Sequence, residues 1–381
     1  MTAQVMCFDM AGAGDVSVLD AWLAGLPRDS ISRLVVFAKT EGHHAPNDFS
    51  RDLLKLQLER LFERHGLTDR AISMLAIGSE GVGSPKGFAF AQTHEDSPLA
   101  AAEGTLAAAE ATLAAGDGNR PPAGAARDDL PARLTLGFAR SAPVPVGEIG
   151  TLALIDRVAD TARAALRDAG LEASQVRLLF IKSPLLPARH PAATPANTTM
   201  HRGRAISALG GGVALGEIDR AQLTDASIAR DLSLYTRHVQ GITGAEINRV
   251  EAVALGNRPG AGGDLRIDST HTRDLLDQRS IRALLADNGF RFDAFGDLLD
   301  GERIEALIAK TMVPEDGVVR GSRTTVYSSG WAPESHIRAA ASGVFGSLLG
   351  HLRFFVSADS VHQAPEGGGM VAVVFREDAL K

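Results

Sequence analysis

Three lysines stand at the ends of three short apolar runs of the sequence. Lys39 ends RLVVFAK, Lys182 ends VRLLFIK and Lys310 ends IEALIAK. A continuous run of Val, Ile, Leu and Phe indicates a buried strand. A single lysine at a strand end is usually a solvated charge, but three in equivalent places of a repeat indicate a shared site.

Each lysine is followed by a loop and then by an arginine that opens a helical segment. These arginines are Arg51, Arg204 and Arg338. If the repeat brings the strand ends together around an axis, three ammonium and three guanidinium groups face one cavity. That arrangement costs Coulomb energy unless an anionic or carbonyl-rich group lies between them. Clustering also lowers the pKa of a lysine, so one of them could act as a neutral base. The six cations therefore predict a site for a small anionic or carbonyl-rich compound.

The elements that must position these cations repeat three times along the chain. Each unit is predicted as a strand, a helix, the strand that ends in lysine, the helix opened by arginine, and a last strand. The first strands are predicted at 4–10, 133–140 and 250–257, the first helices at 17–26, 147–170 and 272–289, and the last strands at 72–81, 235–246 and 352–361. The segment 147–170 has apolar residues at helical spacing and ends at Gly170.

The repeat predicts an α/β fold of three pseudo-equivalent α/β units around a pseudo-threefold axis, with strands meeting in a central barrel-like core. We place the units at 1–128, 129–249 and 250–381. Within the first unit, residues 99–128 stand outside the repeat. Their Ala-rich half predicts a helix, and their Gly/Pro/Asp-rich half predicts a flexible linker to the second unit.

Composition excludes several classes of protein. The chain has 381 residues, of which 45% are hydrophobic and 5% aromatic, and its net charge is −7. An acidic chain with few aromatic residues is not typical of a nucleic-acid binder. Cys7 is the only cysteine, which fits a reducing compartment. Neither a secretory signal nor a membrane-length apolar run is present, so we expect a cytoplasmic protein with no membrane partner.

Several long motifs resemble the cyanuric acid hydrolases and barbiturases, the ring-opening amidohydrolases. The resemblance covers nearly the whole chain, and the sequence is identified as a divergent member. The residues that carry it are FAKTEG with NDFSR near 37–51, EGVGSP at 80–85, IKSPLL at 181–186, SALGGGVALGEI at 207–218, RDLSLY at 230–235 and HQAPEGGGMVAVV at 362–374.

The resemblance implies a specific site. In that family three pseudo-equivalent units surround a ring-shaped substrate, and each unit supplies a Lys, an Arg and a Ser. Arginines and backbone amides hold the ring carbonyls, while a Ser–Lys pair of the middle unit attacks a ring amide. The resemblance also implies a homo-oligomer, a tetramer. The family lysines match Lys39, Lys182 and Lys310, and the family arginines match Arg51, Arg204 and Arg338.

The family serines are mostly missing here. Their expected positions hold Ala76, Ile242 and Ser357. The N–H and carbonyl groups of a fully polar ring such as cyanuric acid would find no hydrogen-bond partner at Ala76 and Ile242. Each unmade buried hydrogen bond costs about 1–3 kcal/mol of binding free energy. We therefore expect a less symmetric ring with an apolar edge, namely a substituted pyrimidine-dione, a cyclic imide or a lactam. The residues expected to contact it at the strand ends are Ala76, Ile77, Ile242, Thr243, Ser357 and Ala358.

Three alternatives remain for the chemistry. Ser357 could work with Lys310, Thr243 could replace the missing serine beside Lys182, or the lysines could catalyse proton transfer or water attack without a covalent nucleophile. We prefer Ser357 with Lys310, because Ser357 alone is a serine at a position where the resemblance implies one.

The sequence predicts no cofactor, but the resemblance implies a structural divalent cation near the loop 362–369. The family glutamate for this ion is Met312 here, and Asp359 could compensate for it. Hard cations prefer carboxylate oxygen. If an ion binds, its candidate ligands are Ser360, Gln363, Ala364, Pro365 and Gly368.

The leading functional hypothesis is a cyclic amidohydrolase that opens a small N-heterocycle by Ser–Lys chemistry. The second is a non-hydrolytic isomerase or lyase on the same scaffold, using lysine as acid and base. The third is a binding protein that kept the cationic pocket and lost turnover. Because buried cations without a ligand destabilise a fold, six retained cations disfavour the third hypothesis.

Overall fold

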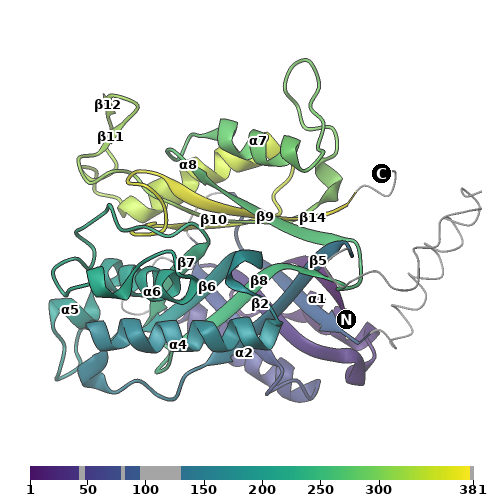
Figure 1. The fold of residues 1–381 in the computed structure, drawn as a ribbon, viewed down its shortest axis with the longest axis horizontal. Coiled ribbons are helices and arrows are strands. Elements are labelled where there is room, and N and C mark those ends of the chain that lie inside the picture. Colours follow the sequence, from purple (N-terminus) through teal and green to yellow (C-terminus); the bar gives the residue numbers. More distant parts are fainter. Residues whose placement is uncertain (43–47, 79–81, 95–129, 378–381) are drawn as a thin grey trace, which may run out of the picture.

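The computed structural model describes residues 1–42, 48–78, 82–94 and 130–377. The helix and linker predicted at 99–128 lie outside these residues. The described chain forms an α/β fold with mixed sheets (Figure 1), which confirms the α/β part of the predicted fold.

Twelve strands form three four-stranded sheets with one common order. In each sheet, the strand that ends in a site lysine runs parallel to the next strand of the same sheet. It runs antiparallel to the sheet's last strand in chain order. Sheet 1 has the order β1 (Thr2–Asp9), β4 (Lys86–Thr93), β2 (Ile31–Thr40), β3 (Ala71–Ile77). Sheet 2 has the order β5 (Ala132–Arg140), β8 (Glu251–Pro259), β6 (Val176–Pro184), β7 (Val239–Gly244). Sheet 3 has the order β9 (Leu265–Thr272), β14 (Gly369–Arg376), β10 (Ile304–Thr311), β13 (Phe354–Ala358).

Helices cover one face of each sheet. They are α1 (Ser17–Gly25) and α2 (Ser50–Arg64) on sheet 1, α4 (Leu152–Ala169) and α6 (Met200–Leu215) with the short α5 (Pro195–Thr198) on sheet 2, and α7 (Gln278–Asp287) and α8 (Pro333–Leu349) on sheet 3. A small hairpin of β11 (Val318–Val319) and β12 (Ser322–Arg323) precedes α8. As predicted, α4 ends at Gly170, whose φ of 64° is the left-handed conformation that glycine adopts readily.

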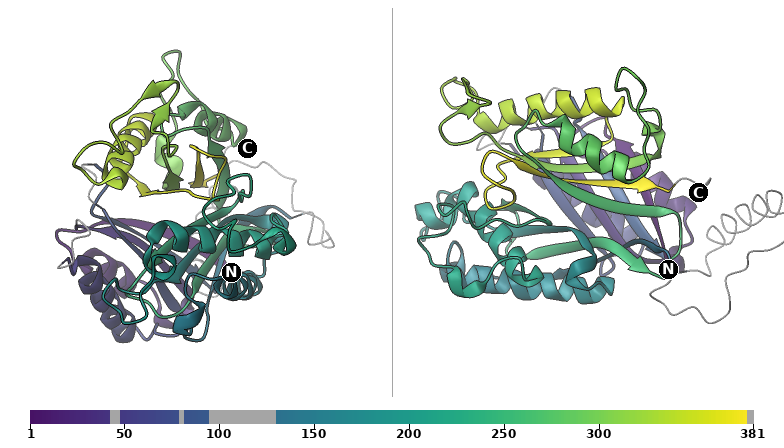
Figure 2. Two further views of the ribbon diagram at one scale, coloured as in Figure 1. Left: turned by 90° about the vertical axis from the view of Figure 1, so that its left-hand side faces the viewer. Right: turned by 45° about the horizontal axis from the view of Figure 1, so that its top comes forward.

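The opposite faces of the three sheets meet in a central apolar core. Phe37, Phe180 and Phe355 come from the three sheets and pack edge to face, with ring centroids 5.0 Å apart for Phe37–Phe180 and 5.9 Å apart for Phe180–Phe355. Successive side chains of a strand alternate between this core and the helix-covered face. Figure 2 shows sheet 3 lying above sheets 1 and 2. Within the described residues the ladders remain three separate sheets, so the predicted barrel-like core is not confirmed.

The strand predicted to open the third unit belongs to the second sheet. The segment 250–257 was predicted as the first strand of the third unit, but it is β8, which lies between β5 and β6 in sheet 2. The third sheet begins with β9 instead. That strand was missed because Arg266, Asp268 and His271 interrupt its apolar pattern, whereas β8 is a continuous buried run.

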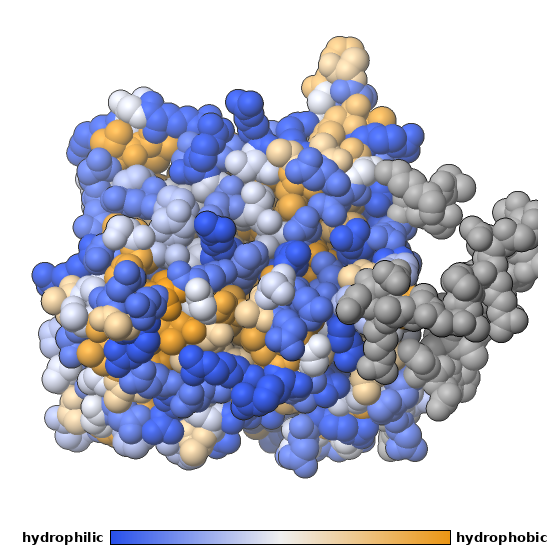
Figure 3. All heavy atoms as spheres, viewed as in Figure 1, coloured by the Kyte–Doolittle hydropathy of each residue, from blue (hydrophilic) through white to orange (hydrophobic). Residues whose placement is uncertain are grey.

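The outer surface is mostly polar on the face drawn in Figure 3, as expected when apolar side chains are buried between the layers of the fold. Apolar side chains are scattered among polar ones on this face. In the described part of the chain, no helix is long and apolar enough to cross a membrane.

Candidate active site

The strand register places each site lysine opposite one expected serine position. Lys39 pairs with Ala76, Lys182 with Ile242, and Lys310 with Ser357. The lysine side chains are almost fully buried, with exposed fractions of 1%, 2% and 0% in the same order. Among these three pairs, a hydroxyl faces a lysine in sheet 3 alone.

Two of the ammonium groups reach from one sheet to the next. Lys39 Nζ donates to the carbonyl of Val356 in sheet 3 at 2.5 Å. Lys182 Nζ donates to the carbonyl of Leu75 in sheet 1 at 3.0 Å. Each acceptor immediately precedes the register partner of another lysine. These two hydrogen bonds join the lysine ends of sheets 1 and 3 and of sheets 2 and 1.

Lys310 and Ser357 lie within hydrogen-bond distance of each other in sheet 3. Lys310 Nζ lies 3.3 Å from Ser357 Oγ and donates to the carbonyl of Ala358 at 2.8 Å. Burial lowers the pKa of Lys310 well below the ordinary value of 10.5, and the positive charge of Arg204 acts in the same direction. A lysine with a lowered pKa can be neutral and accept the proton of a neighbouring hydroxyl.

Lys182 has a carboxylate for a partner instead of a hydroxyl. It forms an ion pair with Glu246, and Arg51 binds the same carboxylate at 2.9 Å. Burial lowers the pKa of Lys182, although Glu246 acts in the opposite direction. The negative charge of Glu246 thus balances the positive charges of Lys182 and Arg51. Sequence reasoning gave Glu246 no role, although it closes the motif that starts at Ile242.

Thr243 does not face Lys182 in this structure. Its hydroxyl donates to the carbonyl of Ser183 at 2.8 Å, and the Ser183 hydroxyl in turn accepts from Ser207 of α6 at 2.9 Å. Neighbouring residues of a strand point to opposite faces, so Thr243 and Ile242 lie on different sides of sheet 2. This geometry disfavours Thr243 as the base-activated nucleophile beside Lys182.

The other two arginines also meet carboxylates of the chain. Arg204 binds Glu334 at 2.6 Å and Asp359 at 2.8 Å, and Arg338 lies 3.5 Å from Glu334. Burial acts to raise the pKa of Asp359, but the charges of Arg204 and His201 outweigh it and lower that pKa. Internal carboxylates were not foreseen from the sequence, and they weaken the argument that the retained cations require a ligand.

The remaining predicted contact residues are apolar, and they lie on two different faces of their strands. Ala76 and Ile242 pack against the central core. Ile77 and Ala358 are buried, with exposed fractions of 5% and 1%. Ser357 therefore supplies the hydroxyl among the three side chains in register with the lysines, which are Ala76, Ile242 and Ser357.

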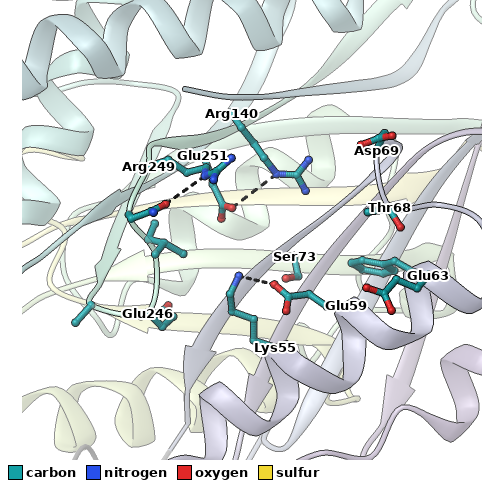
Figure 4. Close-up of a pocket in the computed structure, with 14 residues that line it drawn as sticks. Lys55, Glu59, Glu63, Thr68, Asp69, Ser73, Arg140, Glu246, Arg249 and Glu251 are labelled. Carbon is teal, nitrogen blue, oxygen red and sulfur yellow. Dashed lines mark hydrogen bonds and ion pairs between the residues drawn. The ribbon is translucent and has the colours of Figure 1, made fainter. Parts of the chain in front are cut away.

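Two cavities adjoin this constellation. One has a volume of 670 Å³ and is lined by Arg338, Glu334 and Asp359 together with apolar side chains. The other has a volume of 630 Å³ and touches the site through Glu246. Figure 4 shows that its walls carry ion pairs, with Lys55–Glu59 of α2 on one side and Arg140–Glu251 of sheet 2 on the other.

The loop 359–369 does not fit a hard divalent cation. Met312 offers a thioether where a carboxylate is needed. Ser360 Oγ donates to the carbonyl of Gly368 at 2.6 Å, and the Gln363 side-chain oxygen accepts a backbone N–H at 2.9 Å. Asp359 is held in its ion pairs. Across the described ranges, no group of three His, Cys, Asp or Glu side chains could hold a metal ion. The other two candidate ligands, Ala364 and Pro365, are buried and exposed respectively.

The fold and the cationic site define a class of protein, and comparison with known proteins agrees with it. The family model described as "amidohydrolase ring-opening protein" matches residues 4–116 and 119–376. The chain belongs to this family of ring-opening amidohydrolases, as a divergent member, and is a cyclic amidohydrolase by class.

Relatives and solved structures match over the full length. A cyanuric acid amidohydrolase of Methylobacterium sp. (strain 4-46) is 32% identical over 98% of this chain and 97% of the relative. A cyclic amide hydrolase of Azorhizobium caulinodans is 30% identical over 96% and 97%. The crystal structure of a cyanuric acid hydrolase from A. caulinodans has a TM-score of 0.79 at 27% identity and covers 99% of both chains. A second cyanuric acid hydrolase structure has a TM-score of 0.81 at 29% identity and covers 98% of this chain and 99% of the other.

Proposed function

We propose that the protein hydrolyses a small cyclic amide or imide, with Ser357 as nucleophile and Lys310 as base. The contact between Lys310 Nζ and Ser357 Oγ carries this proposal. Lys39 and Lys182 face Ala76 and Ile242, neither of which can attack a carbonyl. The working pair has thus moved from the middle unit, where the resemblance implies it, to the third.

The proposed reaction needs only groups of the site and water. Neutral Lys310 accepts the Ser357 proton while Oγ bonds to a ring carbonyl carbon. The tetrahedral intermediate collapses, the ring C–N bond breaks, and the leaving nitrogen takes the proton from Lys310. Water, deprotonated by the same amine, then hydrolyses the acyl-serine and restores the hydroxyl. Arg338 and backbone N–H groups near β13 would stabilise the negative oxygen of both intermediates.

The proposal includes a threefold arrangement of the site. Three sheets of equal strand order support a pseudo-threefold axis near the Phe37, Phe180 and Phe355 rings. Such an axis explains why Lys39 and Lys182 reach equivalent carbonyls, those of Val356 and Leu75, in another sheet. The substrate then meets three similar walls, of which one has a hydroxyl and two are apolar.

We expect the preferred ring to be a substituted pyrimidine-dione, cyclic imide or lactam rather than cyanuric acid. Apolar Ala76 and Ile242 cannot pair with ring N–H or carbonyl groups, and each unpaired buried group costs about 1–3 kcal/mol. A barbiturate-like ring with one apolar edge avoids this loss. The active form is expected to be a homo-oligomer, a tetramer, which sedimentation analysis would measure.

A lysine acid–base enzyme without hydrolysis is the second candidate. The ion pair of Lys182 and Glu246 favours it, because these buried groups could move a proton without any nucleophile. In that case Lys182, rather than Lys310, would be indispensable.

One experiment separates the candidates. The wild type, Ser357→Ala, Lys310→Met and Lys182→Met are incubated with barbiturates, hydantoins, cyclic imides and lactams while ring absorbance and product mass are followed. We expect ring opening with a gain of one water, lost in Ser357→Ala and Lys310→Met. Opening that survives Ser357→Ala but is lost in Lys182→Met would refute the proposed pair. Thermal unfolding of each variant verifies that it is folded.

A further inference from the structure

The 670 Å³ cavity lies next to the proposed Ser–Lys pair. Met312 and Asp359, which line it, follow Lys310 and Ser357 by two residues each. Lys310 Nζ donates to the carbonyl of Ala358 at 2.8 Å, and the next residue, Asp359, lines the cavity, so the cavity wall is near the reacting groups. A ring bound at Ser357 would therefore have this space at its edge.

The cavity walls are largely apolar. Met200, Met312, Pro333 and Ile337 contribute aliphatic surface. Tyr327 donates its hydroxyl to the carbonyl of Val313 at 2.7 Å, so its hydroxyl is already used and its ring forms part of the wall. Burial of apolar ligand surface against such walls is favourable.

The carboxylates Glu334 and Asp359 of the cavity wall already have partners in the protein, so they do not need a charged ligand. Glu334 and Asp359 are both ion-paired with Arg204, and His201 contacts Asp359 at 3.0 Å. A ligand carboxylate or ammonium would have to compete with these internal pairs. The volume lies in the range of pockets that hold drug-sized molecules, which a bare five- or six-membered ring does not fill.

We propose that this cavity binds an uncharged apolar substituent, aryl or branched alkyl, carried by the cyclic amide that Ser357 attacks. This inference rests on the proposed function and narrows its substrate class. The cavity then acts as a specificity subsite, because binding energy from the substituent favours substituted rings over the parent ring.

Ala332 offers a way to close the cavity without disturbing the core. It lines the cavity, is exposed, and immediately precedes α8. A tryptophan there can extend into the cavity from its solvent side. Ala340 is exposed on the same helix and is not one of the lining residues. Ala340→Trp is therefore the matched control for Ala332→Trp.

The assay compares hydantoin with 5-phenylhydantoin and barbituric acid with 5-phenylbarbituric acid. We expect kcat/KM of the wild type and of Ala340→Trp to be roughly tenfold or more higher for the phenyl member of at least one pair. In Ala332→Trp this ratio should fall close to one, because kcat/KM for the phenyl member falls. A wild-type ratio near one in both pairs, or a ratio unchanged by Ala332→Trp, overturns the proposal.

Binding separates this inference from the proposed hydrolase. If no ring of either pair is opened, the hydrolase proposal fails, and calorimetry with the same four compounds tests the cavity alone. Phenyl compounds that bind roughly tenfold tighter than the parents, with the difference lost in Ala332→Trp, support the subsite. Equal affinity for the parent and phenyl compounds refutes it.

Discussion

Asp359 accepts a hydrogen bond from Arg204 at 2.8 Å across the contact between sheets 2 and 3. In the first two copies of the motif the equivalent position is glycine, Gly78 and Gly244. Asp359 has a φ of 67°, a left-handed conformation that suits glycine and is tolerated by aspartate. No positive φ is recorded for Gly244, so the third copy changes the backbone at this position and also adds a carboxylate that pairs with an arginine of the site.

Asp359→Asn should destabilise the protein. The change removes one of two carboxylates from the buried Arg204, and Glu334 remains, so we expect a loss of about 2 kcal/mol rather than the 3–5 kcal/mol of a fully broken buried pair. The free energy of unfolding in urea measures it. The exposed residue Glu366 lies in the same loop, and Glu366→Gln is the control, expected within about 0.5 kcal/mol of the wild type. Equal stabilities of the two variants would contradict the role given to Asp359.

The same ion pair makes stability depend on pH on the acid side. The pKa of Asp359 is lowered from its ordinary 3.8, so the folded protein binds the proton less tightly than the unfolded chain. This contribution is complete above the unfolded pKa and is lost as pH falls through the folded one. We expect Asp359→Asn to flatten the fall of unfolding free energy below pH 4 in urea titrations. A fall as steep as that of the wild type would contradict the assignment.

Much of this site follows from residue types at repeated spacing. The strands that carry Lys39, Lys182 and Lys310 were predicted, because a continuous apolar run with a terminal charge is a strong local pattern. Their register with Ala76, Ile242 and Ser357 could be anticipated from the motif that follows each third strand. The family was identified from its long motifs.

The internal ion pairs could not be predicted in the same way. Arg204 and Glu334 lie 130 residues apart, and no local pattern relates them. The strands β4, β9 and β14 were also missed, and β8 was predicted as a strand but assigned to the third unit, because it looks like a first strand when the chain is read locally. Which strand pairs with which is decided by long-range hydrogen bonding and by burial of both sheet faces, and these are not visible in residue spacing.

Ring opening should increase with pH. Neutral Lys310 is the proposed base, and its pKa lies well below the ordinary 10.5, so the active form accumulates as pH rises through that lowered value. A profile of kcat/KM against pH should show one ascending limb with a midpoint below 10.5. Ser357→Cys is a useful second variant, because a thiol needs less help from a base and should shift the ascending limb to lower pH. A flat profile between pH 5 and 10 would contradict lysine as base.

Ile242→Ser restores a hydroxyl opposite Lys182. Two effects are expected. The lost buried side chain should lower the free energy of unfolding by about 2–4 kcal/mol. The new polar wall should also improve acceptance of a symmetric polar ring, so the ratio of kcat/KM for cyanuric acid to that for a barbiturate should rise. Ile242→Ala is the control, since it creates a similar void without a hydroxyl. An equal ratio in both variants would show that the polar wall does not set ring preference.

Gly216 directly follows the last residue of α6, the helix that carries Arg204. Replacing it measures how much the left-handed end of this helix contributes to the free energy of unfolding. The φ of Gly216 is 72°, and a Cβ placed there would meet no atom within 4 Å, so Gly216→Ala adds backbone strain without a clash. We expect a loss of about 1 kcal/mol in unfolding free energy. Gly25 at the end of α1 is equally open, and no positive φ is recorded for it, so Gly25→Ala is expected to be neutral or slightly stabilising. Both changes add one methyl group in open space. A larger loss of unfolding free energy in Gly216→Ala than in Gly25→Ala therefore measures the strain of the left-handed conformation at the end of α6. Equal losses in the two variants would contradict this strain.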